Sequence, residues 1–178
     1  ALSFAALSAH AQENVRWGIP MAFGANLIGL GDTMPWVSEQ LKKVSGGTIN
    51  LQVFEPGKLV PALGIFDAVA SGKVEAGYSF MGYEVGKVPV SAIFGALPFG
   101  METPQYAAWI YYGGGDALLK EAYKPHNVYP IFCGSISPEA AGWFKKEIKT
   151  PDDLKGMKFR AAALGGKIYQ KLGASVTM

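Results

Sequence analysis

The stretch VRWGIPMAFGANLIGLGDTMPWVSEQLKKVSGGTINLQVF, residues 15–54, indicates how the chain folds. Its first part, Val15–Met21, has the composition of a strand, and residues 27–44 carry apolar side chains at helical spacing. A Gly-Gly pair then follows, as is typical of a helix end, and Thr48–Phe54 alternates apolar and polar residues as a strand does. The stretch therefore predicts a strand, a helix and a second strand.

The same alternation continues along the chain. Residues 61–71 begin with proline and are followed by glycine, which is typical of a helix, and residues 75–80 predict a third strand. Strands and helices that alternate with short connections favour an α/β fold with a mostly parallel sheet. Further expected elements are an apolar segment at 92–99, a helix at 103–123 interrupted by three glycines, and a strand at 128–133.

The C-terminal quarter starts another α/β unit. Thr150 has the character of a helix N-cap, and it is followed by proline and two aspartates, which suit the positive end of a short helix. A strand is expected at 157–161, a helix at 166–172 and a further strand at the end of the sequence. The composition becomes loop-like near residue 134, so we predict a first lobe at residues 12–134 and a hinge with the start of a second lobe at 135–178.

The composition excludes several functional classes. The chain of 178 residues is 49% hydrophobic, which suits a globular protein, and its net charge of +2 comes from basic residues spread along the sequence. That spread argues against nucleic-acid binding. Cys133 is the single cysteine, so no internal disulfide forms. His10 and His126 have no metal-ligand spacing, which argues against transition-metal chemistry.

The first residues resemble the end of a secretory leader. Residues 1–7 are small and apolar, and Ala9-His10-Ala11 has the form of a signal-peptidase site. We therefore expect residues 1–11 to be a signal-peptide remnant and the mature protein to be exported to the periplasm. The alternative is an ordinary apolar N-terminal helix. No later apolar run is long enough to span a bilayer.

Arg160 is the most informative single residue. It lies in the otherwise apolar run MKFRAAAL, at the expected carboxyl end of a strand and just before a helix. Ligands of α/β sheets bind at this edge, and a guanidinium there can pair with an anion. The alternative is a structural ion pair with an acid such as Glu139, and the spacing alone does not decide between the two.

Two long segments resemble a known family. These are GYSFMGYEVGKVPVSAIFGALPFGM, residues 77–101, and GWFKKEIKTPDDLKGMKFRAAALGGKIYQKLGAS, residues 142–175. Together they resemble the extracytoplasmic solute-binding proteins of tripartite ATP-independent periplasmic (TRAP) transporters, the DctP family. The PFG segment, the run PDDLKGMKFR and the following KLGA are the most specific parts. The GWFKK form is most similar to the branch that binds 2-oxo acids and lactate.

The resemblance implies a two-lobe, periplasmic-binding-protein-like α/β fold with the ligand enclosed between the lobes. The first lobe would be nearly complete and the second truncated, so the chain is expected to be a piece of a longer protein. In this family the arginine of the KxR strand holds the substrate carboxylate, which implies that role for Arg160. Aromatic walls of the cleft are implied for Tyr83 first, then Tyr78 and Phe80, and Trp143 is a further aromatic candidate.

Glu139 departs from the family pattern. The organic-acid branch usually has glutamine or asparagine ahead of the GWF sequence, where this chain has Glu139. Its carboxylate could pair with Arg160, bind a cation or share a proton with a hydroxylated ligand. Some members hold a sodium or calcium ion beside the substrate through residues of the second half, so a Na or Ca ion is an expected cofactor whose ligands stay unknown.

The resemblance therefore implies a periplasmic binding protein and not an enzyme. It would capture a small 2-oxo or 2-hydroxy monocarboxylate and deliver it to TRAP transporter membrane subunits, and a homodimer is one expected form. One alternative is a carboxylate-processing enzyme in which Arg160 holds the substrate and Glu139 acts as the base. A sensory relative with the same lobes is the other alternative.

Overall fold

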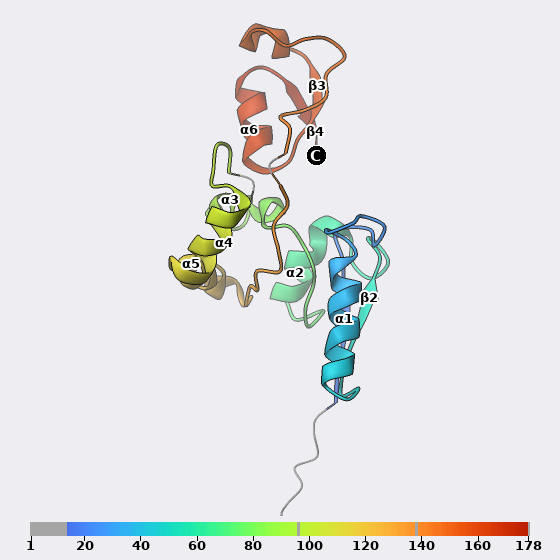
Figure 1. The fold of residues 1–178 in the computed structure, drawn as a ribbon. Helices are drawn as coiled ribbons and strands as arrows, with labels where there is room; N and C mark the ends of the chain where they lie inside the picture. The colour runs from blue at the N-terminus through green and yellow to red at the C-terminus, as the bar shows by residue number, and fades with distance from the viewer. Residues whose placement is uncertain (1–13, 96, 138, 178) are drawn as a thin grey trace, which may run out of the picture.

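A computed structural model describes residues 14–95, 97–137 and 139–177 of the chain, and the predicted signal-peptide remnant lies outside them. We refer to residues 14–137 as the N-terminal unit and to residues 139–177 as the C-terminal unit (Figure 1). In chain order the elements are β1 (Val15–Pro20), α1 (Thr33–Val44), β2 (Ile49–Phe54), η1 (Ala62–Gly64), α2 (Ile65–Ala70), η2 (Met81–Glu84), α3 (Ser91–Phe94), α4 (Thr103–Tyr112), α5 (Gly115–Tyr123), η3 (Lys124–His126), η4 (Pro151–Leu154), β3 (Lys158–Arg160), α6 (Ala163–Lys171) and β4 (Ser175–Thr177), where η marks a 3₁₀ helix.

The strand–helix–strand unit predicted from residues 15–54 is confirmed. Strands β1 and β2 are parallel, with Val15 opposite Ile49 and Pro20 opposite Phe54, and α1 connects them. The side chain of Met34 on α1 packs into a small core formed with residues of β1 and the chain that follows it. Apolar burial between the helix and the sheet therefore stabilises this unit.

Helix α1 begins six residues later than the apolar spacing predicted. Residues 27–32 form turns instead, because the loop folds back tightly on itself. A Cβ atom on Gly31 would lie 1.8 Å from the carbonyl oxygen of Gly24. The Asp32 carboxylate accepts a hydrogen bond from the Gly29 N–H at 2.7 Å. The end of the helix matches the prediction, since the Gly47 N–H donates to the Lys42 carbonyl at 2.8 Å.

Two predicted strands are corrected by the structure. The segment at 75–80 forms a single bridge between Met21 and Tyr78 instead of a full strand. The segment at 128–133 is extended but is not a strand, and the side chains of Tyr129 and Ile131 are 70% and 73% exposed. A strand requires a neighbour to complete its hydrogen-bond ladder, and the described residues supply none to either segment beyond that bridge.

A second core lies among the helices of the N-terminal unit. The predicted interruption of the helix at 103–123 is confirmed, since α4 ends at Tyr112 and Gly114 takes a left-handed conformation with φ of +85° before α5. That conformation favours glycine. The buried members of this core are Phe66, Val88, Phe94, Ile110, Leu119 and Tyr123.

The C-terminal unit is a small β–α–β arrangement. Strands β3 and β4 are parallel, with Arg160 opposite Thr177, and α6 connects them and begins three residues earlier than predicted. The turn before β3 has the predicted cap, in which the Thr150 N–H donates to the Asp153 carboxylate at 2.9 Å. The ring of Phe159 lies between this sheet and α6, 4.5 Å from the ring of Tyr169.

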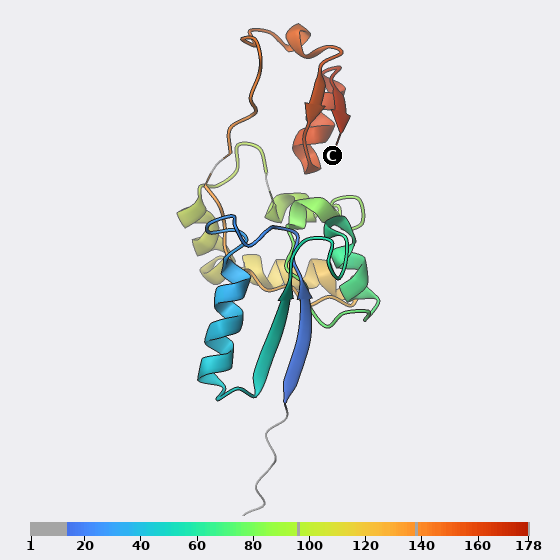
Figure 2. The same ribbon diagram turned by 90° about the vertical axis from the view of Figure 1, so that its right-hand side faces the viewer.

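The two units meet at the carboxyl ends of β1 and β2. Figure 2 shows both strands ending on the side of the N-terminal unit that carries the C-terminal unit, with α6 standing over the helical turns there. Helix α6 contacts η2 across this junction. The Thr103 hydroxyl also donates to the Ile136 carbonyl at 3.1 Å, which holds the connecting chain against α4. The predicted lobe boundary near residue 134 stays a prediction.

Candidate functional site

Arg160 lies at the end of β3, as the sequence predicted. Its side chain is exposed, because side chains alternate along a strand and the neighbouring Phe159 takes the buried face. Within the described part of the chain, Arg160 forms no ion pair with an acidic side chain. The predicted alternative, an ion pair between Arg160 and Glu139, is therefore absent from the described residues.

Glu139 and Trp143 are both placed in extended chain before β3. Glu139 is exposed and forms no ion pair with the described residues. Trp143 is 88% exposed. The adjacent Phe144 is the residue that packs, with its ring stacked 5.4 Å from that of Phe159. Among the described residues, Glu139 and Trp143 form no hydrogen bond, ion pair or aromatic ring pair with the other candidate residues.

Tyr78, Phe80 and Tyr83 are brought together into one aromatic cluster. The rings of Phe80 and Tyr83 meet edge to face at 5.3 Å. Phe23, in the loop after β1, lies 6.2 Å from the ring of Tyr78 and 6.3 Å from that of Tyr83. We call these four residues the aromatic cluster. It lies beyond the carboxyl end of β1, where ligands of parallel sheets bind.

Phe23 was missed by the sequence reasoning. The loop after the first strand of a parallel sheet is a signal that could have identified it, but no periodic pattern distinguishes an aromatic residue in such a loop. The ring is half-buried and contacts both Tyr78 and Tyr83. It therefore belongs to the same surface as the three predicted residues.

The backbone fixes the position of Tyr78. Its N–H donates to the Pro20 carbonyl at 2.9 Å and its carbonyl accepts from the Ala22 N–H at 2.8 Å. Burial raises the pKa of the Tyr78 phenol, and a hydrogen bond with the Thr33 side chain opposes that rise. The phenol is therefore neutral at physiological pH and serves as a hydrogen-bond donor.

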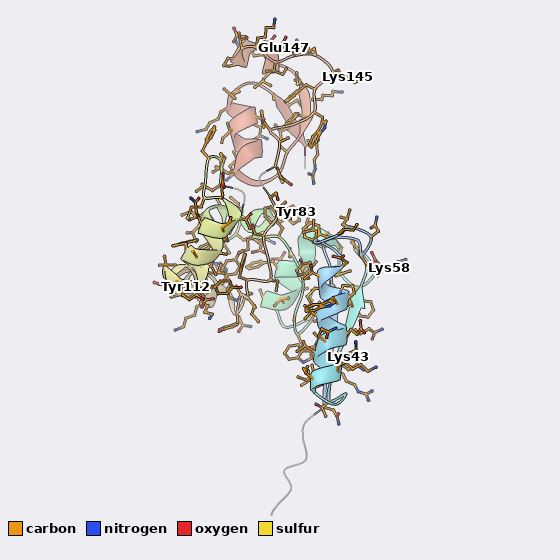
Figure 3. The ribbon with its side chains drawn as sticks, viewed as in Figure 1. Lys43, Lys58, Tyr83, Tyr112, Lys145 and Glu147 are labelled. Carbon is orange, nitrogen blue, oxygen red and sulfur yellow. The ribbon has the colours of Figure 1, made fainter. Side chains whose placement is uncertain are left out.

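Tyr83 lies where the two units meet (Figure 3). It belongs to η2, the turn that contacts α6, and α6 follows Arg160 after a two-residue connection. The arginine and the aromatic cluster thus belong to different units, which meet through the contact between η2 and α6. A small ligand with one anionic end and one apolar end would match such a pair of surfaces.

The described residues do not by themselves form a metal site. In residues 14–95, 97–137 and 139–177, no three acidic, histidine or cysteine side chains gather as metal ligands. Glu139 supplies one exposed carboxylate in the C-terminal unit. The same described residues contain no helix that is both long enough and apolar enough to cross a membrane.

Comparison with known families identifies the family to which the chain belongs. Residues 31–178 match the family described as bacterial extracellular solute-binding protein, family 7, or DctP. The chain belongs to the DctP family. The resemblance drawn from the quoted motifs is therefore confirmed, and the match is to a solute-binding family rather than to an enzyme family.

Individual relatives agree with this assignment. The chain is 38% identical over 163 residues to a monocarboxylate 2-oxoacid-binding periplasmic protein of Nostoc sp., covering 92% of this chain and 44% of that protein. It is 36% identical, with a TM-score of 0.88, to a TRAP periplasmic solute-binding protein of Colwellia psychrerythraea with bound calcium and pyruvate, covering 93% of this chain and 51% of that one.

A third relative shows the same fold. It is a TRAP transporter solute-binding protein of Bordetella bronchiseptica, described as a dimer with copurified calcium and picolinate in one active site and the other site apo. The identity is 31% and the TM-score 0.88, over 93% of this chain and 49% of that one. The structural similarity to these solute-binding proteins confirms the two-lobe α/β fold class. The chain spans about half the length of the relatives it matches.

Proposed function

We propose that this chain is part of a periplasmic solute-binding protein that captures a small 2-oxo monocarboxylate, of which pyruvate is the first candidate. The observation that carries the proposal is the exposed Arg160 at the end of β3, with no ion-pair partner in the described residues. A carboxylate is the natural partner of a guanidinium because two parallel hydrogen bonds form between them. The relatives named for 2-oxoacids and pyruvate support this ligand class.

The aromatic cluster supplies the second half of the proposed site. Its rings offer an apolar surface for the methyl or alkyl end of the acid, and the Tyr78 and Tyr83 phenols offer hydrogen-bond donors for the keto oxygen. A site that requires both an anion and a small apolar group selects short organic acids over neutral solutes. Residues from the remainder of the full-length protein would complete the enclosure.

Export, partners and a cation belong to the same proposal. We infer that the mature protein works in the periplasm and delivers its ligand to TRAP transporter membrane subunits, as the DctP family match supports. The calcium of the Colwellia and Bordetella proteins supports a calcium or sodium ion beside the ligand. The dimer recorded for the Bordetella protein supports a homodimer. No binding step proposed for this chain is routed through the cation.

Calorimetric titration of the full-length protein with pyruvate tests the proposal. The wild type is expected to bind, and Arg160→Ala is expected to lose at least about a hundredfold in affinity, equal to about 3 kcal/mol. Lys158→Ala is the matched control, since Lys158 lies two residues earlier on the same face of β3 and is also exposed. Equal losses in the two variants, or pyruvate binding that survives Arg160→Ala, would overturn the assignment of Arg160.

A further inference from the structure

Glu84 is a carboxyl group buried inside the N-terminal unit. It is the last residue of η2 and is 8% exposed. Its carboxylate accepts a hydrogen bond from the hydroxyl of Tyr123 on α5, a member of the helical core. A buried acid without compensation is strongly destabilising, so this pairing is needed to keep Glu84 inside.

Other polar groups approach the pair from the neighbouring elements. Ser91 on α3 is fully buried beside the Tyr123 hydroxyl, and its side chain opposes the rise in the Tyr123 pKa that burial causes. Lys87 attracts the Glu84 carboxylate from the following turn. Lys87 is itself ion-paired with Asp67 of α2.

Among the described residues, the other titratable groups of the neighbouring elements form no hydrogen bond or ion pair with Glu84. Tyr106 on α4 influences Tyr123 and not Glu84. The ring of His126 in η3 packs against Phe66. On α6, another element that contacts η2, the side chains of Lys167 and Lys171 are exposed. The charge state of Glu84 is therefore governed by its burial, by Tyr123 and by Lys87.

The hydrogen bond from Tyr123 depends on the charge of Glu84. While Glu84 is ionised, its carboxylate is a strong acceptor because the hydrogen bond is charge-assisted. Once Glu84 is protonated, that charge assistance is lost and the hydrogen bond weakens. Burial raises the pKa of Glu84 to about 7, and the Tyr123 hydrogen bond and Lys87 limit that rise. The change in the hydrogen bond therefore falls near neutral pH.

Glu84 follows Tyr83 directly in the chain, in a turn whose backbone has little conformational freedom. The turn η2 has only four residues, and its backbone touches another segment, since a Cβ atom on Gly95 would lie 2.8 Å from the Gly82 nitrogen. The side chain of Tyr83 belongs to the aromatic cluster, whereas that of Glu84 points into the helical core of the N-terminal unit. A change in the hydrogen bond of Glu84 thus reaches Tyr83 through one peptide unit.

We propose that Glu84 is a positioning residue whose charge state sets the orientation of Tyr83 and so makes the aromatic side of the site sensitive to protons. The inference rests on the proposed function for the part that Tyr83 plays in ligand binding. The part of the proposal that concerns Glu84 and Tyr83 alone can be measured without ligand.

Carbon-13 NMR of the full-length protein labelled with ring-13C tyrosine tests the structural part of this proposal. The resonance of Tyr83, assigned by its loss in Tyr83→Phe, is followed from about pH 5 to about pH 9, below the range in which an ordinary tyrosine titrates. In the wild type it is expected to shift with a midpoint near pH 7, and in Glu84→Gln it is expected to stay constant. A constant wild-type resonance, or a shift that persists in Glu84→Gln, would overturn the proposal.

Two further variants keep the test decisive. Tyr123→Phe retains the ring and removes the donor that favours ionised Glu84, so the Tyr83 midpoint is expected to move to higher pH. Asp116→Asn is the matched control, because Asp116 is an exposed acid paired with Lys120 on α5, and its midpoint is expected to equal that of the wild type. An unchanged midpoint in Tyr123→Phe would count against the proposal even if Glu84→Gln fails to fold.

Pyruvate binding measured at about pH 6 and about pH 8 separates this inference from the proposed function. Arginine and the ligand carboxylate keep their charges across this range. Wild-type affinity is expected to differ several-fold between the two pH values, and the affinity of Glu84→Gln is expected to be equal at both. Binding that depends on Arg160 but has the same pH dependence in Glu84→Gln would end the inference alone. A Tyr83 resonance that shifts with pH as expected, in a protein that does not bind pyruvate, would overturn the proposed function alone.

Discussion

The phenyl rings of Phe144 and Phe159 lie parallel, with centroids 5.4 Å apart and 2° between their planes. Phe159 also contacts the ring of Tyr169 on α6 at 4.5 Å. The stack therefore joins the connecting chain, β3 and α6. Because successive side chains on a strand point to opposite faces, the burial of Phe159 directs Arg160 outward. The position of the proposed carboxylate anchor thus depends on an aromatic contact made one residue earlier.

Replacing Phe159 by alanine is expected to destabilise the C-terminal unit. The change removes both ring contacts and leaves space between β3 and α6, so the free energy of unfolding should fall by about 2–4 kcal/mol. Pyruvate affinity should fall with it, because Arg160 loses its support. Denaturant unfolding and calorimetry of the full-length protein measure the two effects.

Trp143→Ala is the control for that change, since this side chain is 88% exposed. Its effect on the free energy of unfolding is expected to stay within about 0.5 kcal/mol. If Trp143→Ala destabilised the protein as much as Phe159→Ala does, the stacking account of this region would be wrong.

Two glycines of the C-terminal unit are expected to respond to alanine in opposite directions. At Gly142 a Cβ atom would lie 2.6 Å from the ring of Phe159, so Gly142→Ala should push the stack apart and destabilise by about 1–3 kcal/mol. At Gly165, inside α6, nothing lies within 4 Å of the added atom. Gly165→Ala should therefore stabilise by up to about 1 kcal/mol through helix propensity. Thermal or denaturant unfolding measures both effects. A Gly142→Ala variant as stable as the wild type would refute the packing described for Gly142, and a destabilised Gly165→Ala variant would refute the open space at Gly165.

Stability is expected to decrease as the pH rises from about 4.5 to about 7 on account of Glu84. Burial raises the pKa of this carboxyl from its ordinary value of 4.5 to about 7 in the folded protein. The folded state therefore holds a proton that the unfolded state releases, and the favourable contribution is complete below pH 4.5 and lost as the pH rises through 7. The loss is on the order of 3 kcal/mol.

The free energy of unfolding of wild type and Glu84→Gln, measured across this pH range, isolates the effect. Glutamine resembles the protonated acid and carries no titratable group, so the difference between the two proteins should change with pH by the amount given above. A difference that is independent of pH would show that Glu84 is ionised in the folded protein throughout.

Removing the ring of Phe23 is expected to weaken ligand binding without unfolding the protein. Phe23 contacts Tyr78 and Tyr83, so Phe23→Ala leaves the aromatic cluster without support on one side. A loss of about tenfold in pyruvate affinity corresponds to about 1.4 kcal/mol. Ile28→Ala is the matched control in the same loop, because Ile28 is 93% exposed. Equal affinities for the two variants would remove Phe23 from the site.

Local signals in the sequence were sufficient for several elements. The Gly-Gly pair placed the end of α1, the three glycines placed the break between α4 and α5, and Thr150 as an N-cap followed by proline and two aspartates placed the turn before β3. Each depends on backbone preferences that act within a few residues. The segment at 128–133 was predicted wrongly because its strand character depends on a partner that lies outside it.

Some residues of the candidate site were likewise identified from the sequence, and others only from the structure. Arg160 at the end of a strand and Tyr83 in its turn were identified from the sequence and its family resemblance, although their roles stay proposals. Phe23 could not be identified in advance, because its contacts with Tyr78 and Tyr83 join segments more than fifty residues apart in the chain. The sequence likewise did not show that Phe144, and not Trp143, packs against Phe159.

The sequence by itself determined the alternation of strands and helices, the family and the arginine that ends β3, because periodicity, capping residues and motifs are local properties of the chain. Only the tertiary structure decided which aromatic rings gather beyond β1, that Arg160 forms no ion pair with Glu139 in the described residues, and that Glu84 is buried against Tyr123. Those features depend on packing between distant segments, where burial and the loss of water set the energies.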